Sequence, residues 1–394
     1  MLDLDLVRPR FPALAETGPT GEPLVHADAP GGTQAVDAAI EAMAGHLRAG
    51  TANQHGTFAV SRRTDLLVDT VREQLAGFLG TEAEGVVFGP NMTTLTIHLA
   101  RSLDVQLGAN DTIVCTQLDH DANVSPWLAL AARTGTTVRF VELDPRTGRL
   151  DPASLEDVVD ERTRVIAFPG ASNALGTVVD PAPFVAAARA VDAWTVMDGV
   201  HTVPHLAVDR HALGVDVMLC SAYKFYGPHA GILAADPQLL TALTPERLRP
   251  APDEGPERWQ TGTASFESIA GIGGAVAYLA GLGMDVVAEH EHTLTARFLD
   301  GIETLDDVTL HGPPEATQRT PTFAVTVAGH TPNAVAQHLA DRGINVWAGH
   351  YYAIEPMYVL GLLEHGGAVR IGFAHYHGVT DVDRVIAALA ELSS

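Results

Sequence analysis

A lysine follows a strongly apolar run and precedes an aromatic, glycine-proline loop. Lys224 lies between Tyr223 and Phe225 in the segment SAYKFYGPHAG (221–231). An amine at the end of a buried strand is partly desolvated, which lowers its pKa and prepares it for Schiff-base chemistry. A lysine in a surface loop is the alternative interpretation, and this segment alone leaves both open.

A carboxylate ends another apolar run. Asp198 lies in VMDGVH (196–201), 26 residues before Lys224. Such an aspartate is commonly a helix cap. It is also what an enzyme that uses pyridoxal 5′-phosphate (PLP) needs beside the pyridine nitrogen, because a protonated ring can absorb the electrons of an amino-acid carbanion.

Further polar side chains occupy similar positions. GPNMTTLTIHLA (89–100) opens a helix, where free N–H groups with the hydroxyls of Thr93 and Thr94 suit a phosphate. His120 could stack on a cofactor ring, and Asn173 could bind a phenolic oxygen. Taken singly, they could equally be a helix cap, a solvent-facing histidine and a turn residue. All of them follow predicted strands, so one cleft would collect them.

Short apolar runs alternate with helical patterns between residues 82 and 235. The runs are GVVFG (85–89), TIVC (112–115), TVRFVEL (137–143), RVIAFPG (164–170), WTVMDG (194–199), DVMLCS (216–221) and GILAA (231–235). Continuous apolar runs are typical of strands covered on both faces. The alternation predicts an α/β fold with a mostly parallel seven-stranded sheet, in which ligands bind at the carboxyl ends of the strands.

The rest of the chain predicts a second, smaller unit. Residues 265–303 indicate two helices with a break near Gly281 and Gly283, and the stretch 304–394 mixes strands and helices. An amphipathic helix is expected within 35–50. We therefore predict three parts: residues 1–50 pack with the small domain, residues 51–285 form the large PLP-binding domain, and residues 286–394 form a small α+β domain.

Composition limits the possible partners. The formal net charge of the 394-residue chain is −24, which disfavours nucleic acid and anionic membranes as partners. No apolar run has the length of a membrane span or of a signal peptide, so a cytoplasmic protein is expected. Cys115 and Cys220 both end apolar runs and are expected to be buried thiols without a disulfide.

The motifs together resemble the class V aminotransferase family, which has the aspartate-aminotransferase fold (PLP fold type I). The resemblance extends to its cysteine desulfurase–selenocysteine lyase branch and, more closely, to the cysteine desulfurase-like subgroup. It covers essentially the whole chain. The motifs that carry it are HADAPGG (26–32), NQHGTFAVSRRTD (53–65), NMTTLTIHLA (91–100), LDHDANVSPW (118–127), SNALGTVVD (172–180), DGVHTVPH (198–205), DVMLCSAYKFYGP (216–228), RWQTGTASFE (258–267), GHYYA (349–353) and AVRIGFAHYHGVTDVDR (368–384).

The resemblance implies a role for each matching position. Lys224 would form the imine with PLP, Asp198 would pair with the pyridine nitrogen, His120 would stack on the ring, and Asn173 would touch the phenolic oxygen. Arg370 would bind the substrate α-carboxylate. The remaining expected cofactor contacts are Thr93, Thr94, Ser221, His201, Tyr223, Gly262 and Thr263, and the remaining expected substrate contacts are His55, His350 and Tyr352. Gly262 and Thr263 would reach the phosphate of the other subunit, because the family forms homodimers with shared sites.

The chain departs from the desulfurase pattern in its sulfur-handling residues. Desulfurases carry a nucleophilic cysteine after a Gly-His pair, where this chain has Tyr352 in WAGHYYAIEP (347–356). Trp347 replaces an arginine of the same loop. Tyr223 and His201 stand where a His and a Gln are common. A phenol cannot form a persulfide, so the reaction is expected to have changed while PLP is kept.

Several reactions would follow removal of the Cα proton of an amino acid. Loss of a β-leaving group is the preferred interpretation, as in a C–S lyase acting on a cysteine derivative. Reprotonation at C4′ would give an aminotransferase, and reprotonation at Cα a racemase or epimerase. Two further classes are alternatives: a metal site built from His350, His375 and His377 with Asp121 or Glu355, and a PLP-free binding or scaffold protein.

Overall fold

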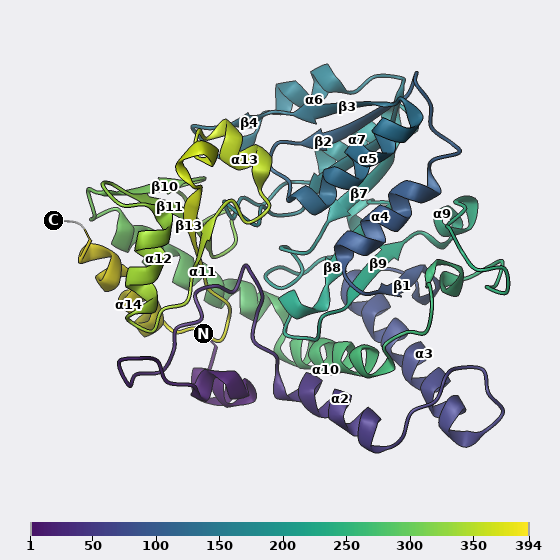
Figure 1. Ribbon diagram of the computed structural model, residues 1–394, viewed down its shortest axis with the longest axis horizontal. Helices are drawn as coiled ribbons and strands as arrows, with labels where there is room; N and C mark the ends of the chain where they lie inside the picture. Colours follow the sequence, from purple (N-terminus) through teal and green to yellow (C-terminus); the bar gives the residue numbers. More distant parts are fainter. Residues whose placement is uncertain (1, 393–394) are drawn as a thin grey trace.

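A seven-stranded sheet forms the centre of the molecule (Figure 1). The computed structural model describes residues 2–392. The strand order is β1-β9-β8-β7-β6-β2-β3, and only β9 runs antiparallel to its neighbours. The strands are β1 (Val86–Gly89), β2 (Thr112–Thr116), β3 (Thr137–Val141), β6 (Thr163–Pro169), β7 (Trp194–Asp198), β8 (Val217–Ser221) and β9 (Gly231–Ala235). Each of the seven predicted runs contributes one strand, so the predicted α/β fold is confirmed.

The sheet is buried on both faces. In β6, Ile166 and Phe168 join one hydrophobic cluster, whereas Val165 and Ala167 join a second cluster. This two-sided burial explains why the strands are continuous apolar runs. The helices of this region are α3 (Ala59–Leu79), α4 (Met92–Ser102), α5 (Ser125–Thr134), α6 (Pro152–Val158), α7 (Ala182–Ala190), α8 (Arg210–Leu213), α9 (Pro237–Ala242) and α10 (Phe266–Leu282).

Two consecutive helices link the central sheet to the smaller unit. α10 is followed by α11 (Met284–Ile302), and the break falls at Gly283, whose φ is +89°. The predicted helix pair with a glycine break is confirmed. Among residues 2–392, no single helix has the length and apolar composition of a membrane span. Only α10 and α11 taken together would pass, and they meet at a bend of 78°. α10 is covered by α2 (Asp37–Arg48) and α3.

The smaller unit contains a four-stranded antiparallel sheet in the order β10-β11-β13-β12. Its elements are β10 (Val308–His311), β11 (Thr322–Val327), α12 (Pro332–Ala340), β12 (Trp347–Gly349), α13 (Ile354–Val359), β13 (Ala368–Gly372) and α14 (Val379–Ala390). α11, α12 and α14 contribute to its hydrophobic core. β10 was not predicted. β12 begins at Trp347, and Ile344 just before it forms a separate bridge with Val25.

Residues 2–50 contact both units (Figure 1). Arg8 lies 2.8 Å from the Asp381 carboxylate of α14, and Asp28 forms a bridge with Gly372 of β13. By contrast, α2 packs against α10. The N-terminal segment therefore crosses the boundary between the small and the large sheet. Its crossing brings Pro30 to the ends of the central strands.

Candidate active site

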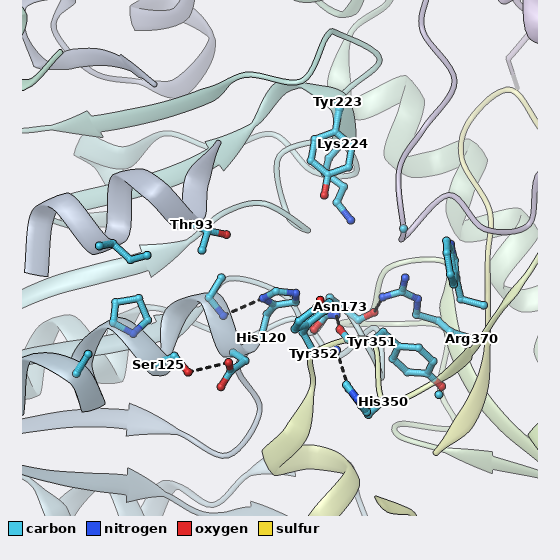
Figure 2. Close-up of a pocket in the computed structure, with 18 of the residues that line it drawn as sticks. Thr93, His120, Ser125, Asn173, Tyr223, Lys224, His350, Tyr351, Tyr352 and Arg370 are labelled. Atoms are coloured by element: carbon cyan, nitrogen blue, oxygen red, sulfur yellow. Dashed lines mark hydrogen bonds between the residues drawn. The ribbon is translucent and has the colours of Figure 1, made fainter. Parts of the chain in front are cut away.

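One cavity collects polar side chains at the carboxyl ends of β6, β7 and β8. It has a volume of about 90 Å³. The predicted residues that line it are Thr93, His120, Asn173, Asp198, His201, Ser221, Tyr223 and Lys224. A larger cavity of about 1000 Å³ shares His120, Asn173, Tyr223 and Lys224 and adds Arg370, His350 and Tyr352 (Figure 2). Residues that end or follow β1, β2, β6, β7 and β8 thus meet residues of the 347–353 loop, as the sequence predicted.

Lys224 is a buried amine with a low proton affinity. It ends a short 3₁₀ turn after β8, and its Nζ donates to the Pro30 carbonyl oxygen. Burial, with the nearby Arg370 cation, lowers the pKa of Lys224 to about 7, against the opposing effect of Asp198. Lys224 is also the only lysine in the sequence, so the one lysine side chain of the protein lies in this cavity.

Asp198 is the last residue of β7 and is buried. Its Oδ1 accepts a hydrogen bond of 2.8 Å from the backbone N–H of Val200. Burial raises the pKa of Asp198 to about 6, although the Val200 hydrogen bond and Lys224 both act to lower it. A desolvated carboxylate gains most from a cationic partner in the same cavity. Asp198 and Lys224 share one cavity, which the predicted arrangement requires.

The N-terminus of α4 lies beside Ser221. The backbone N–H of Met92 donates to Ser221 Oγ at 3.0 Å, and Thr93 lines the cavity. Thr94, which was also expected to contact the phosphate, does not line this cavity. Its N–H and its hydroxyl both donate to Asn91 Oδ1, at 2.8 and 2.9 Å. Thr93, Ser221 and the helix N-terminus are therefore the groups of this chain that could hold a phosphate.

Gly262 and Thr263 lie with Thr94 in a different pocket, of about 220 Å³, on the other side of α4. Both residues are exposed in the loop before α10. In this chain they do not line the Lys224 cavity, so their expected contact with a second subunit stays a prediction.

His120 presents a neutral ring to the cavity. Its Nδ1 accepts a 3.0 Å hydrogen bond from the Ala122 N–H, so the ring proton belongs on Nε2. Burial, reinforced by Lys224 and Arg370, lowers the pKa of His120 to about 3. The Tyr352 ring lies 5.6 Å from the His120 ring, between centroids.

Arg370 and Asn173 leave unpartnered polar atoms at the inner end of the large cavity. Arg370 Nη1 donates to the Asn173 carbonyl oxygen at 3.0 Å, and the guanidinium lies 4.6 Å from the centroid of the Tyr351 ring. Arg370 Nε and Asn173 Oδ1 are buried without a hydrogen-bond partner. Burial lowers the pKa of Arg370 to about 10, so it remains charged at neutral pH. These unsatisfied groups fit a bound polar ligand.

The loop that carries Tyr352 is fixed to the large unit by its backbone. The Asp121 N–H donates to the Tyr352 carbonyl oxygen at 2.7 Å, and Asn173 Nδ2 donates to that of Tyr351 at 3.1 Å. Tyr351 and Tyr352 both have positive φ angles, 43° and 58°. The conformation leaves the Tyr352 side chain 65% exposed at the mouth of the cavity.

Some sequence expectations are not met within this chain. His55 does not line either cavity, and it lies instead 3.6 Å from Asp65 and 3.3 Å from Glu257. Within residues 2–392 no three His, Cys, Asp or Glu side chains are grouped as metal ligands, so His350, His375 and His377 do not form the alternative metal site.

Sequence reasoning also missed contacts. It gave no role to the Pro30 carbonyl, although HADAPGG carries part of the resemblance. It named Tyr351 only as one possible proton donor to a leaving group, and it did not predict that the Arg370 guanidinium would lie over the Tyr351 ring.

A buried amine and a buried carboxylate in one cavity, with a helix N-terminus and an arginine beside it, define a PLP-dependent enzyme of fold type I. The polar atoms left unsatisfied at Asn173 and Arg370, and the low pKa of Lys224, fit that cofactor and its amino-acid partner.

Comparisons with known proteins support this class. The family model for aminotransferase class-V matches residues 25–385, so the chain belongs to the class V aminotransferase family. A cysteine desulfurase of Klebsiella pneumoniae is 33% identical, covering 99% of this chain and 98% of the relative. The apo structure of a cysteine desulfurase from Thermococcus onnurineus has a TM-score of 0.93 at 25% identity, covering 100% of this chain and 98% of that one. A structure described as a C-DES mutant with glycine covalently linked to its PLP cofactor has a TM-score of 0.83 at 20% identity, covering 99% of this chain and 100% of that one.

Proposed function

We propose that the protein catalyses β-elimination from an amino acid that carries a leaving group on Cβ, such as a cysteine S-conjugate. When bound, PLP supplies an electron sink for negative charge that develops at Cα. The net reaction consumes one water and converts R–S–CH₂–CH(NH₃⁺)–COO⁻ into the thiol R–SH, pyruvate and ammonium.

The residues of the cavity would have different roles in this reaction. Arg370 stays charged and has a free Nε, which suits it to the substrate α-carboxylate. Lys224, with a pKa of about 7, is poised to take the Cα proton near neutral pH. His120 and Asn173 line the same cavity.

The observation that carries the proposal is the phenol at the cavity mouth. Tyr352 stands where the desulfurase pattern has its cysteine. Cys115 and Cys220 are fully buried in β2 and β8, where burial raises their pKa values. No thiol lines either cavity. Without a sulfur acceptor, a leaving thiolate is expected to be protonated and released. Tyr352, Tyr351 and His350 all line the cavity, and one of them would supply that proton.

Product analysis tests the proposal. The PLP-loaded protein is incubated with S-substituted cysteines, and pyruvate, ammonia and thiol are measured. Equal amounts of all three are expected, with none from Lys224→Ala. Accumulation of pyridoxamine 5′-phosphate without pyruvate would establish an aminotransferase instead. Deuterium exchange at Cα with no other product would establish an epimerase or racemase.

A further inference from the structure

The larger cavity extends beyond the residues needed for an amino-acid backbone. From Lys224 it continues along a groove between α4 and α5, on the side of His120 away from Arg370; Thr93 and Ser125 mark its start (Figure 2). Two helical faces, each with a spacing of four residues, line it: Thr93, Ile97 and Arg101 on α4, and Ser125, Ala129 and Arg133 on α5. Eight residues of helix give the groove a length of about 12 Å.

The middle of this α4–α5 groove is apolar. Its walls there are Ile97, Ala122, Pro126 and Ala129, and Ile97 is 39% exposed. An apolar surface that continues directly from a catalytic cavity is suited to an apolar part of the substrate. The full cavity, at about 1000 Å³, is at the upper end of the range for ligands much larger than a simple amino acid.

The far end of the groove has two arginines that are each paired with a carboxylate outside the cavity lining. Arg101 Nη1 lies 3.3 Å from Glu246, and Arg133 forms hydrogen bonds of 2.7 and 2.9 Å with Asp104. Their charges are therefore balanced, whereas guanidinium faces can still stack on an aromatic ring. The Asp121 carboxylate also lines the groove near its start and disfavours an anionic substituent.

We propose, resting on the β-elimination activity above, that the α4–α5 groove binds the β-substituent of the substrate, and that this substituent is extended, uncharged and aromatic at its end. The substrate class is then the arylalkyl S-conjugates of cysteine. Each added methylene between the sulfur and the ring should lower KM about fourfold while it still lies within the groove.

Filling the groove tests the proposal with a matched pair of variants. Ala129→Trp places an indole in the groove. Ala132→Trp adds the same side chain to the same helix, at an exposed position that does not line the cavity. KM is measured for S-methylcysteine and for phenylalkyl S-conjugates of increasing length. Ala129→Trp should raise KM for the long conjugates by tenfold or more and leave the methyl substrate unchanged, and Ala132→Trp should alter neither.

Binding measured without turnover separates this proposal from the function on which it rests. Titration of the cofactor absorbance with each amino acid gives Kd even if nothing is eliminated. A preference for long conjugates that Ala129→Trp removes would support the groove although elimination had failed. Equal affinity for short and long conjugates overturns it. A change of molar mass by light scattering in Ala129→Trp but not in Ala132→Trp would also overturn it, because the groove would then be a subunit contact.

Discussion

Lys224 is the only lysine among 394 residues, so the reactivity of the catalytic amine can be followed at one side chain. Its environment combines burial, a nearby arginine and a carboxylate in the same cavity. Burial and Arg370 disfavour the ammonium form, and Asp198 favours it. The balance leaves an amine that is substantially unprotonated near neutral pH, which a surface lysine would not be.

This balance predicts the pH dependence of Lys224 modification. In the cofactor-free protein, a small amine-directed reagent should modify Lys224 with a rate that is half-maximal near pH 7, because the amine is protonated and unreactive below that pH. An ordinary lysine would reach this point near pH 10.4. Peptide mass spectrometry separates Lys224 from the N-terminal amine. A midpoint above pH 9 would contradict the desolvation argument.

The contribution of Tyr352 to the rate of elimination is expected to increase with the basicity of the leaving group. If its phenol protonates the departing sulfur, Tyr352→Phe should slow elimination of a basic alkyl thiolate on the order of 10²-fold or more. It should have little effect with a weakly basic aryl thiolate, which needs no proton to depart. The measurement is kcat for the two substrate types.

A second exposed tyrosine provides the control for this test. Tyr358 lies in α13 and does not line the cavity, so Tyr358→Phe should leave both rates unchanged. Equal slowing of both leaving groups by Tyr352→Phe would remove the acid role and leave Tyr352 as a packing residue.

Among the elements, strands buried on both faces were predicted because their sequence is continuously apolar. The edge strand β10 (Val308–His311) was missed, since its side chains are half-exposed or exposed and its sequence has no such run. Polar residues at strand ends identified the cavity, because parallel strands bring those ends together. No comparable rule predicts where residues in long loops will lie. His55 therefore lies where the sequence pattern alone could not place it.

Helix α10 depends on a glycine for its contact with α2. A Cβ on Gly274 would lie 2.4 Å from the carbonyl oxygen of Ala38. Gly274→Ala should therefore force the two helices apart and lower the free energy of unfolding by about 1–3 kcal/mol. At Gly281 of the same helix a Cβ would meet nothing within 4 Å.

Replacement of these two glycines by alanine should thus change the free energy of unfolding in opposite directions. Gly281→Ala is expected to raise the free energy of unfolding by about 0.5–1 kcal/mol, through the lower backbone entropy of alanine in the unfolded chain. Urea denaturation of both variants checks this. Equal effects at the two positions would show that the close approach of α2 and α10 is not what requires Gly274.

For the molecule as a whole, several regions depend on histidines that are buried as neutral rings. His375, in the segment that joins β13 to α14, lies 2.7 Å from Tyr278 of α10 and so connects the small unit to the large one. Burial, with the neighbouring His290 and His205, lowers the pKa of His375 to about 3. Its unfolded value is near 6.5.

The sign of the resulting pH effect follows from proton uptake. Between pH 6.5 and 3 the unfolded chain protonates His375 and the folded chain does not, so this residue destabilises the fold by about 1.4 kcal/mol for each pH unit below 6.5. His375→Gln should be less stable than the parent at pH 7.5, because it alters the contact with Tyr278. That deficit should shrink by about 2 kcal/mol at pH 5.

A core substitution that does not titrate distinguishes this linkage from a general loss of packing. Val385→Ala, in the core of α14, should lower the free energy of unfolding by an amount that does not change with pH. Urea denaturation at pH 7.5, 6.5 and 5 gives the three free energies for each protein. If the loss in free energy of unfolding caused by His375→Gln is as independent of pH as the loss caused by Val385→Ala, then His375 titrates normally in the folded state. The junction between the two units would then be open to water, and a sealed contact between α10 and the β13–α14 segment would no longer account for how the small unit is held over the active site.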